Sequence, residues 1–119
     1  MSSAGDTAIW CEGEDWCPIT ATGTLLGRKW HPVILHQLLE HDRLGYNELL
    51  EGIDGISSKV LSESLKHLEE YDLIDRRIVS EQPFRVEYTL TTAGESTEPI
   101  IQAMAEWGST HLTDPSDEW

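Results

Sequence analysis

YNELLEGIDGISSKVLSESLKHLEEY, residues 46–71, is the stretch that decides the fold. Apolar residues recur at helical spacing on both sides of a short break, namely Leu49, Leu50 and Ile53 before it and Leu61, Leu65 and Leu68 after it. In the break, Gly55 can supply a left-handed backbone, and Ser57 or Ser58 can cap the helix that follows. The stretch predicts helices over 46–53 and 57–71 joined by a tight turn, which is a helix-turn-helix.

The residues that follow predict a β-hairpin. Segments 73–80 and 85–90 read as strands, with Val86, Tyr88 and Leu90 alternating with polar residues, and 81–84 as the tip between them. A hairpin directly after the second helix makes the helix-turn-helix a winged one. In that geometry the N-terminal half of the second helix enters the major groove of DNA, and the hairpin reaches along the backbone.

Further helices are expected outside this unit. Cys17-Pro18 opens a helix over 18–26, because proline suits the first helical position, and a helix over 30–41 follows Gly27. Thr92 and Glu95 have the spacing of a capping box that opens a C-terminal helix, which Pro99 kinks or restarts. The predicted fold is mainly α with a small β-hairpin. We expect one domain over 17–112 between an acidic N-terminal arm (1–16) and an acidic tail (113–119).

The chain is strongly acidic, with 22 Asp+Glu against 8 Lys+Arg and a net charge of −14. Such a surface fits either a cationic partner or the molar-salt cytoplasm of a halophilic archaeon, and the spread of the acids favours salt. All Lys and Arg lie between Arg28 and Arg85, where 11 acids leave a net charge of −3. The winged unit is therefore the part of the chain that can face a polyanion such as DNA.

These cations define a candidate DNA-binding surface. The second helix of the helix-turn-helix turns small polar and basic side chains away from its leucines, the wing adds arginines, and a lysine precedes helix 30–41. The candidates are Ser57, Ser58, Lys59, Ser62, Lys66, Arg76, Arg77, Arg85 and Lys29. The alternative is a protein–protein interaction module that does not bind DNA specifically. Glu63 favours this alternative, because it lies between Lys59 and Lys66 and partly neutralises them.

From Cys17 to Trp107 the chain resembles the HxlR-type family of winged-helix transcriptional regulators. The matching pieces, in order, include Cys17-Pro18, LGRKW at 26–30, GIS at 55–57, KVL at 59–61, LKHLE at 65–69, RVEY at 85–88 and AEWG at 105–108. Each piece is weak alone, but the ordered set is specific and covers about three quarters of the chain.

The resemblance implies a homodimer whose first and last helices form the interface. Two recognition helices would then read the half-sites of a pseudo-palindromic operator. The C-terminal helix supports this interface, because it carries an apolar stripe that a domain of this size would not fully cover. The expected interface residues are Leu25, Ile100, Ile101, Met104 and Trp107. The alternative is that this helix simply closes its own domain.

The two cysteines are Cys11 and Cys17, and in a cytoplasmic chain they are not expected to form a structural disulfide. The helix N-terminus at Cys17 favours a thiolate, although the acidic residues before it oppose one. The resemblance adds that some members sense oxidants or electrophiles through a cysteine in this Cys-Pro position. Cys17 is then the candidate sensor thiol and Cys11 a candidate resolving thiol. The identity of the effector is left open. Alternatively, both are unreactive packing residues.

Other functions find little support in the sequence. No catalytic triad, phosphate loop or carboxylate pair stands out, so an enzyme is not expected. We expect no cofactor and no metal site, because the cysteines lack zinc-site spacing and His31, His36 and His41 rotate around their helix. No apolar run approaches 18 residues and no signal peptide is visible, so we expect a cytoplasmic protein with no membrane partner.

Overall fold

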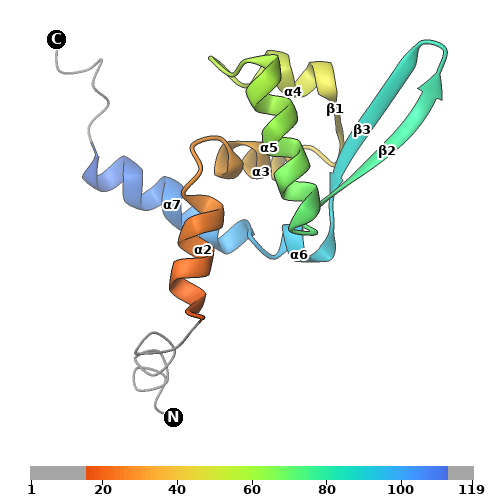
Figure 1. The fold of residues 1–119 in the computed structure, drawn as a ribbon. Helices are drawn as coiled ribbons and strands as arrows, with labels where there is room; N and C mark the ends of the chain where they lie inside the picture. Colours follow the sequence, from red (N-terminus) through yellow and green to blue (C-terminus); the bar gives the residue numbers. More distant parts are fainter. Residues whose placement is uncertain (1–15, 113–119) are drawn as a thin grey trace, which may run out of the picture.

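The structure, a computed structural model, describes residues 16–112. The elements are α2 (Pro18–Leu26), α3 (His31–Glu40), β1 (Leu44–Gly45), α4 (Tyr46–Gly52), α5 (Ser58–Glu70), β2 (Ile74–Glu81), β3 (Phe84–Leu90), α6 (Thr92–Glu95) and α7 (Glu98–His111). Figure 1 shows α4 and α5 as the helix-turn-helix and β2–β3 as a wing that projects from it. The predicted winged helix-turn-helix, mainly helical, is confirmed. The predicted tail, and the predicted arm apart from Trp16, lie outside the described residues.

The turn between α4 and α5 has the predicted chemistry. Gly55 adopts φ +86°, in the left-handed region that favours glycine. Of the two candidate caps it is Ser57 that caps α5, because its Oγ accepts a hydrogen bond from the Val60 backbone N–H at 3.1 Å. Ile53 and Ile56 are buried on either side of the glycine, so the turn is anchored in the core.

Helix α5 ends at Glu70 through a left-handed residue that is not a glycine. Asp72 adopts φ 63°, its N–H donates to the Glu69 carbonyl, and the Leu73 N–H donates to the Leu68 carbonyl. This pair of bonds is a Schellman motif with aspartate in the place glycine usually takes. Because the motif reverses the chain, Leu73 and Ile74 return to the core at the start of β2.

The sheet has three strands, one more than the predicted hairpin. The strand order is β1-β3-β2, and Leu44 and Gly45 pair antiparallel with Tyr88 and Glu87. The sequence pattern predicts no strand between helix 30–41 and helix 46–53. The extra strand ties the base of the wing to the start of α4, whereas the outer part of the wing consists of β2 and β3 alone (Figure 1).

The core lies among α3, α4, α5 and the base of the sheet. The side chains with less than 2% exposure include Ile34, Leu35, Leu49, Leu61, Leu65, Leu68, Ile74 and His31. The three leucines of α5 that the sequence indicated as its buried seam are all in this core. Because that seam faces inward, the opposite side of α5 faces solvent.

The C-terminal region forms two helices. Thr91, one residue before the predicted cap, begins α6: its Oγ1 accepts from the Gly94 N–H at 3.0 Å and donates to the Asp72 carbonyl at 2.7 Å. The predicted capping box between Thr92 and Glu95 is therefore wrong. Pro99 lies in the first turn of α7 and restarts the helix, the second of the two predicted outcomes.

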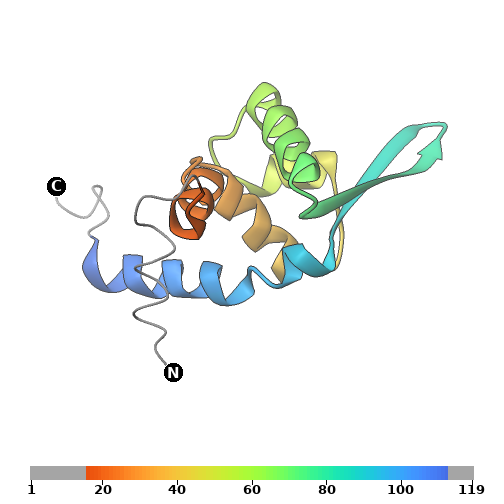
Figure 2. The same cartoon turned by 60° about the horizontal axis from the view of Figure 1, so that its bottom comes forward.

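Helices α2 and α7 are poorly covered by the rest of the protomer. Each has a single fully buried residue, Leu26 in α2 and Ile101 in α7. In Figure 2 α7 runs along the lower edge of the molecule, on the side opposite α5. Among the described residues, no helix has the length and apolar character needed to cross a membrane.

Candidate nucleic-acid interface

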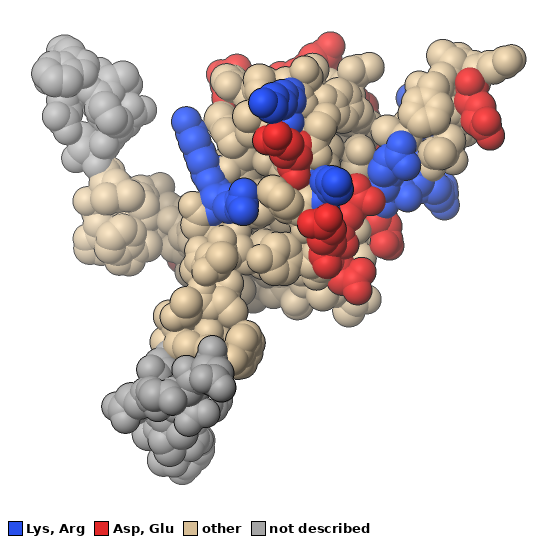
Figure 3. All heavy atoms as spheres, in the orientation of Figure 1, with Lys and Arg blue, Asp and Glu red and all other residues tan. Residues whose placement is uncertain are grey.

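The outer side of α5 carries the residues predicted to face DNA. Ser57, Ser58, Lys59, Ser62 and Lys66 are all exposed, as is Glu63. On the face that Figure 3 shows, Lys and Arg side chains form separate basic areas with acidic side chains between them. On this face cationic and acidic side chains therefore alternate, and the cations do not form one continuous patch.

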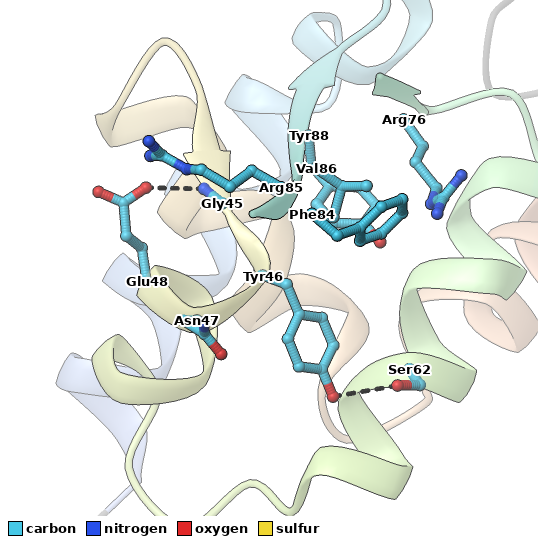
Figure 4. Close-up of a pocket in the computed structure, with 10 residues that line it drawn as sticks. All are labelled: Gly45, Tyr46, Asn47, Glu48, Ser62, Arg76, Phe84, Arg85, Val86 and Tyr88. Carbon is cyan, nitrogen blue, oxygen red and sulfur yellow. Dashed lines mark hydrogen bonds between the residues drawn. The ribbon is translucent and has the colours of Figure 1, made fainter. Parts of the chain in front are cut away.

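A hollow of about 460 Å³ separates α5 from the wing. Figure 4 shows the side chains that line it, which come from the start of α4, from α5 and from both wing strands. They are Gly45, Tyr46, Asn47, Glu48, Ser62, Arg76, Phe84, Arg85, Val86 and Tyr88. The hollow brings together three predicted site residues: Ser62 from α5, and Arg76 and Arg85 from the wing.

Tyr46 was not predicted, yet it connects α4 to the recognition helix. Its hydroxyl donates to the Ser58 carbonyl at 2.9 Å and lies 3.0 Å from Ser62 Oγ (Figure 4). At the same end of α4, Glu48 Oε1 accepts from the Gly45 N–H at 2.7 Å and caps the helix. The aromatic at the first position of α4 was the signal available in the sequence, and its reach to α5 needed the turn geometry.

The wing arginines lie on two faces of the sheet. Arg76 pairs in register with Tyr88 and lines the hollow beside α5. Burial raises the pKa of Tyr88, and the hydrogen bond from Arg76 opposes that shift. Arg77 pairs with Glu87 and lines a second hollow, together with Arg43 and with Arg76. Arg76 therefore lines both hollows, whereas Arg77 does not line the one beside α5.

Lys29 lies at the other side of α5. Its Nζ is 4.8 Å from the centre of the Trp30 ring, a cation–π distance. Both residues, with Arg28, line a small hollow against α5 that also includes Glu63 and His67. Lys29 and the wing therefore flank the recognition helix on opposite sides.

The predicted interface residues of α7 are only partly accessible. Ile100, Met104 and Trp107 recur at i, i+4 and i+7 and are 41%, 43% and 59% exposed. Ile101 is 7% exposed and belongs to the core, so its assignment to the interface is wrong. Leu25 is half-buried and packs against the core.

Cys17 is the N-cap of α2, as predicted, with Pro18 in the first turn. Its carbonyl accepts the Ala21 N–H at 2.8 Å, and the residue is half-buried. Cys17 is disulfide-bonded in the structure, contrary to the expectation that the cysteines form no disulfide. The prediction for Cys11 lies outside the described residues.

Comparison with known proteins identifies the family. A sequence profile described as HxlR-like helix-turn-helix matches residues 25–116, most of the chain. The chain belongs to the HxlR-like family. With its winged helix-turn-helix and exposed recognition helix, this HxlR-like protein is a DNA-binding transcription regulator.

Its relatives carry matching descriptions. The HTH-type transcriptional regulator YodB of Bacillus subtilis is 34% identical over 106 residues, which cover 88% of this chain and 93% of YodB. An HTH-type transcriptional regulator of the archaeon Methanothermobacter thermautotrophicus is 35% identical over 97 residues, covering 82% of this chain and 73% of that protein.

Solved structures show the same fold. The reduced form of YodB matches with a TM-score of 0.70 at 34% identity, over 82% of this chain and 95% of that one. A quinone-bound form of YodB matches with a TM-score of 0.68 at 32% identity, over 80% and 99%. The redox regulator HypR in its oxidised form matches with a TM-score of 0.74 at 28% identity, over 82% and 100%. The HxlR-like fold of this chain thus extends over nearly the full length of these neighbours.

Proposed function

We propose that the protein binds a pseudo-palindromic operator as a homodimer, with α5 of each protomer in the major groove. The observation that carries this proposal is the position of Lys59, Lys66 and Arg85. The two lysines project from the solvent side of α5, and Arg85 lines the hollow between that helix and the wing. A DNA strand lying in this hollow would meet Arg76 and Arg85 of the wing, while Lys59 and Lys66 on the solvent side of α5 face the neighbouring phosphates and the amino end of α5 reads base edges.

The dimer is supported by the poor burial of α2 and α7. Trp16 and Ile19 at the start of α2 are 67% and 60% exposed, and the apolar stripe of α7 is 41% to 59% exposed. Large apolar surfaces of this kind mark interaction sites. Two copies joined through α2 and α7 would leave both α5 helices free, because α7 lies on the opposite side of the domain (Figure 2).

We propose further that oxidation or alkylation of Cys17 changes the affinity for DNA. The support is its place at the N-cap of α2 and its disulfide-bonded state. Relatives add to it, since YodB has a quinone-bound form and HypR is a redox regulator. Cys11 is proposed as the resolving thiol. The effector is then an oxidant or an electrophile, because both classes react with a thiolate.

The test is a gel shift in molar KCl on fragments of the source genome. Lys59→Ala and Arg85→Ala are each expected to weaken binding to the preferred fragment, because each removes a phosphate contact. Arg43→Ala is the matched control: it removes an exposed cation that lies with Arg77 at the other hollow of the sheet. If the protein prefers no fragment, the proposed binding to a specific operator is wrong and the protein–protein module is favoured. Equal losses of DNA affinity in all three variants would show that α5 and the wing do not form the interface.

A further inference from the structure

The hydrogen bonds of Tyr46 fix the direction of the hydrogen bond made by Ser62. A phenol has one hydrogen, and Tyr46 donates it to the Ser58 carbonyl at 2.9 Å. Ser62 Oγ lies 3.0 Å from the same phenol oxygen. The hydrogen between these two oxygens must therefore come from Ser62. This serine uses its only hydrogen inside the protein, and only its lone pairs remain for an outside partner.

The neighbouring residue has the same polarity. Glu63 is exposed beside Ser62 on α5, and a carboxylate accepts hydrogen bonds without donating any. The second turn of α5 thus presents two acceptors, Ser62 toward the wing and Glu63 toward Lys29. Lys59 and Lys66, one turn before and one turn after, are donors only. A helix in the major groove would carry this pattern of donors and acceptors to the base edges.

Two acceptors in a row restrict what α5 can face. Phosphate oxygens are acceptors and negatively charged, so they repel both groups. In the major groove guanine offers N7 and O6 and thymine offers O4, all acceptors, whereas cytosine N4 and adenine N6 carry amino hydrogens. Adenine places the N7 acceptor beside its amino group, where it repels the second oxygen of a carboxylate. Cytosine has no such acceptor and suits a carboxylate better.

We propose that Ser62 and Glu63 are specificity-determining residues that each select an amino-bearing base in each half-site. Glu63 selects cytosine, and Ser62 selects adenine or cytosine. Tyr46 is a positioning residue, because it fixes the Ser62 hydrogen without touching DNA itself. This inference rests on the proposed function, since it requires α5 in the major groove.

The first experiment selects operators from a random DNA library with the full-length protein and with Glu63→Gln. A glutamine both donates and accepts, which matches adenine N6 and N7. The preferred base at one position of each half-site is expected to change from cytosine to adenine, with the cytosine-to-adenine affinity ratio falling about tenfold. Glu98→Gln removes the same charge from an exposed residue of α7 and is expected to leave the operator unchanged.

The second experiment uses Tyr46→Phe, which keeps the ring and removes the hydroxyl. Without the phenol oxygen, Ser62 can donate to guanine or thymine. Its position in the half-site should then accept these bases with about tenfold less discrimination, while the cytosine facing Glu63 is kept. Ser62→Ala, which leaves the Tyr46 bond to Ser58 in place, is expected to relax the same position, so the test does not depend on one variant folding.

The outcomes separate this inference from the function beneath it. A protein that enriches no operator contradicts the proposed function. A protein that enriches a defined operator, with the same base preferences in Glu63→Gln, Tyr46→Phe and Ser62→Ala, contradicts the inference alone. A merely structural role of Tyr46 would lower the affinity for all sequences equally, which would also overturn it.

Discussion

His31 Nδ1 lies 2.9 Å from the carbonyl oxygen of Leu25, so the ring donates to the last turn of α2 from a position at the start of α3. This bond places the imidazole hydrogen on Nδ1 and leaves a lone pair on Nε2. Nε2 is buried and has no hydrogen-bond partner among the described residues. Burial lowers the pKa of His31, and the charges of Arg28 and His67 add to this effect.

The free energy of unfolding is therefore expected to fall in acid. Since the pKa of His31 is lowered in the fold, the unfolded chain binds a proton first as the pH falls below about 6.5. The neutral His31 ring makes its full contribution to the free energy of unfolding above that pH. It is lost below it with a slope of up to about 1.4 kcal/mol per pH unit, until the folded pKa is reached. Denaturant unfolding at fixed protein concentration measures this slope.

His31→Asn keeps a donor for Leu25 and removes the titration, so it should flatten the acid slope while lowering stability at neutral pH. His36→Asn, on the exposed side of the same helix, is the control and should keep the slope. If His31→Asn loses stability in acid as steeply as the native protein, another group is responsible.

Gly94 allows the start of α6 to pack against the start of β2. A Cβ at this position would overlap the Leu73 carbonyl oxygen. Gly94→Ala is expected to destabilise the fold by roughly 1–3 kcal/mol, as overpacking does. Gly23→Ala in α2 meets nothing within 4 Å and should be neutral or stabilising by up to about 1 kcal/mol. Thermal unfolding of the two variants measures the difference in stability between them. Equal effects would show that Gly94 is not needed for this close packing.

The helix-turn-helix could be predicted because its signals are local. Leu61, Leu65 and Leu68 mark the buried side of α5 through their spacing alone, and Gly55 marks the turn. The end of α5 is harder to predict from sequence. Asp72 adopts a left-handed backbone there, and this conformation is usually expected of glycine. Strand β1 has only two residues and is defined by its pairing with Tyr88, a contact far along the chain.

The binding surface was less predictable for the same reason. Lys59 and Lys66 follow from the helical wheel, but the bond from Tyr46 to the recognition helix depends on how α4 and α5 cross. Ile101 looked like a member of an apolar interface, because sequence alone does not tell which of two successive isoleucines meets the core of the protomer. Arg76 and Arg77 were grouped as neighbours and do line one hollow together, but of the two only Arg76 lines the hollow beside α5.

Salt dependence of DNA affinity should be shallower than the number of cations suggests. Each contact between Lys or Arg and a phosphate contributes about −0.9 to the slope of log K against log salt concentration. Glu63 lies between Lys59 and Lys66, and its charge retains or takes up cations when DNA arrives. We expect Glu63→Gln to steepen the slope by up to about one. Titrations at several KCl concentrations test this, and an unchanged slope would contradict it.

The proposed dimer predicts that a charge on α7 separates the protomers. Met104→Glu places a carboxylate in the apolar stripe of Ile100 and Trp107. It should give a folded monomer that binds the operator weakly, because one protomer reads only one half-site. Ser109→Glu adds the same charge to an exposed position on another side of α7 and should stay dimeric. Analytical ultracentrifugation measures the oligomeric state of both variants. A Met104→Glu variant that stays dimeric would show that the interface lies elsewhere.

Cys17 should connect the redox state of the protein to its DNA affinity. Cys17 is the N-cap residue of α2, although its side chain makes no capping hydrogen bond. A change at its sulfur is expected to move the start of a helix placed in the proposed dimer interface, and thereby to change the spacing of the two α5 helices. Diamide and dithiothreitol are expected to give operator affinities that differ by roughly 5- to 150-fold, the usual range of allosteric coupling. In Cys17→Ser this difference should disappear.

The control for this prediction is Lys59→Ala, which should weaken binding in both reagents and keep their ratio, because Lys59 acts at the DNA and Cys17 at the far side of the domain. The native protein is measured in parallel for its oligomeric state. If its operator affinity is the same in diamide as in dithiothreitol, Cys17 is not a switch, and its disulfide serves only to hold the start of α2.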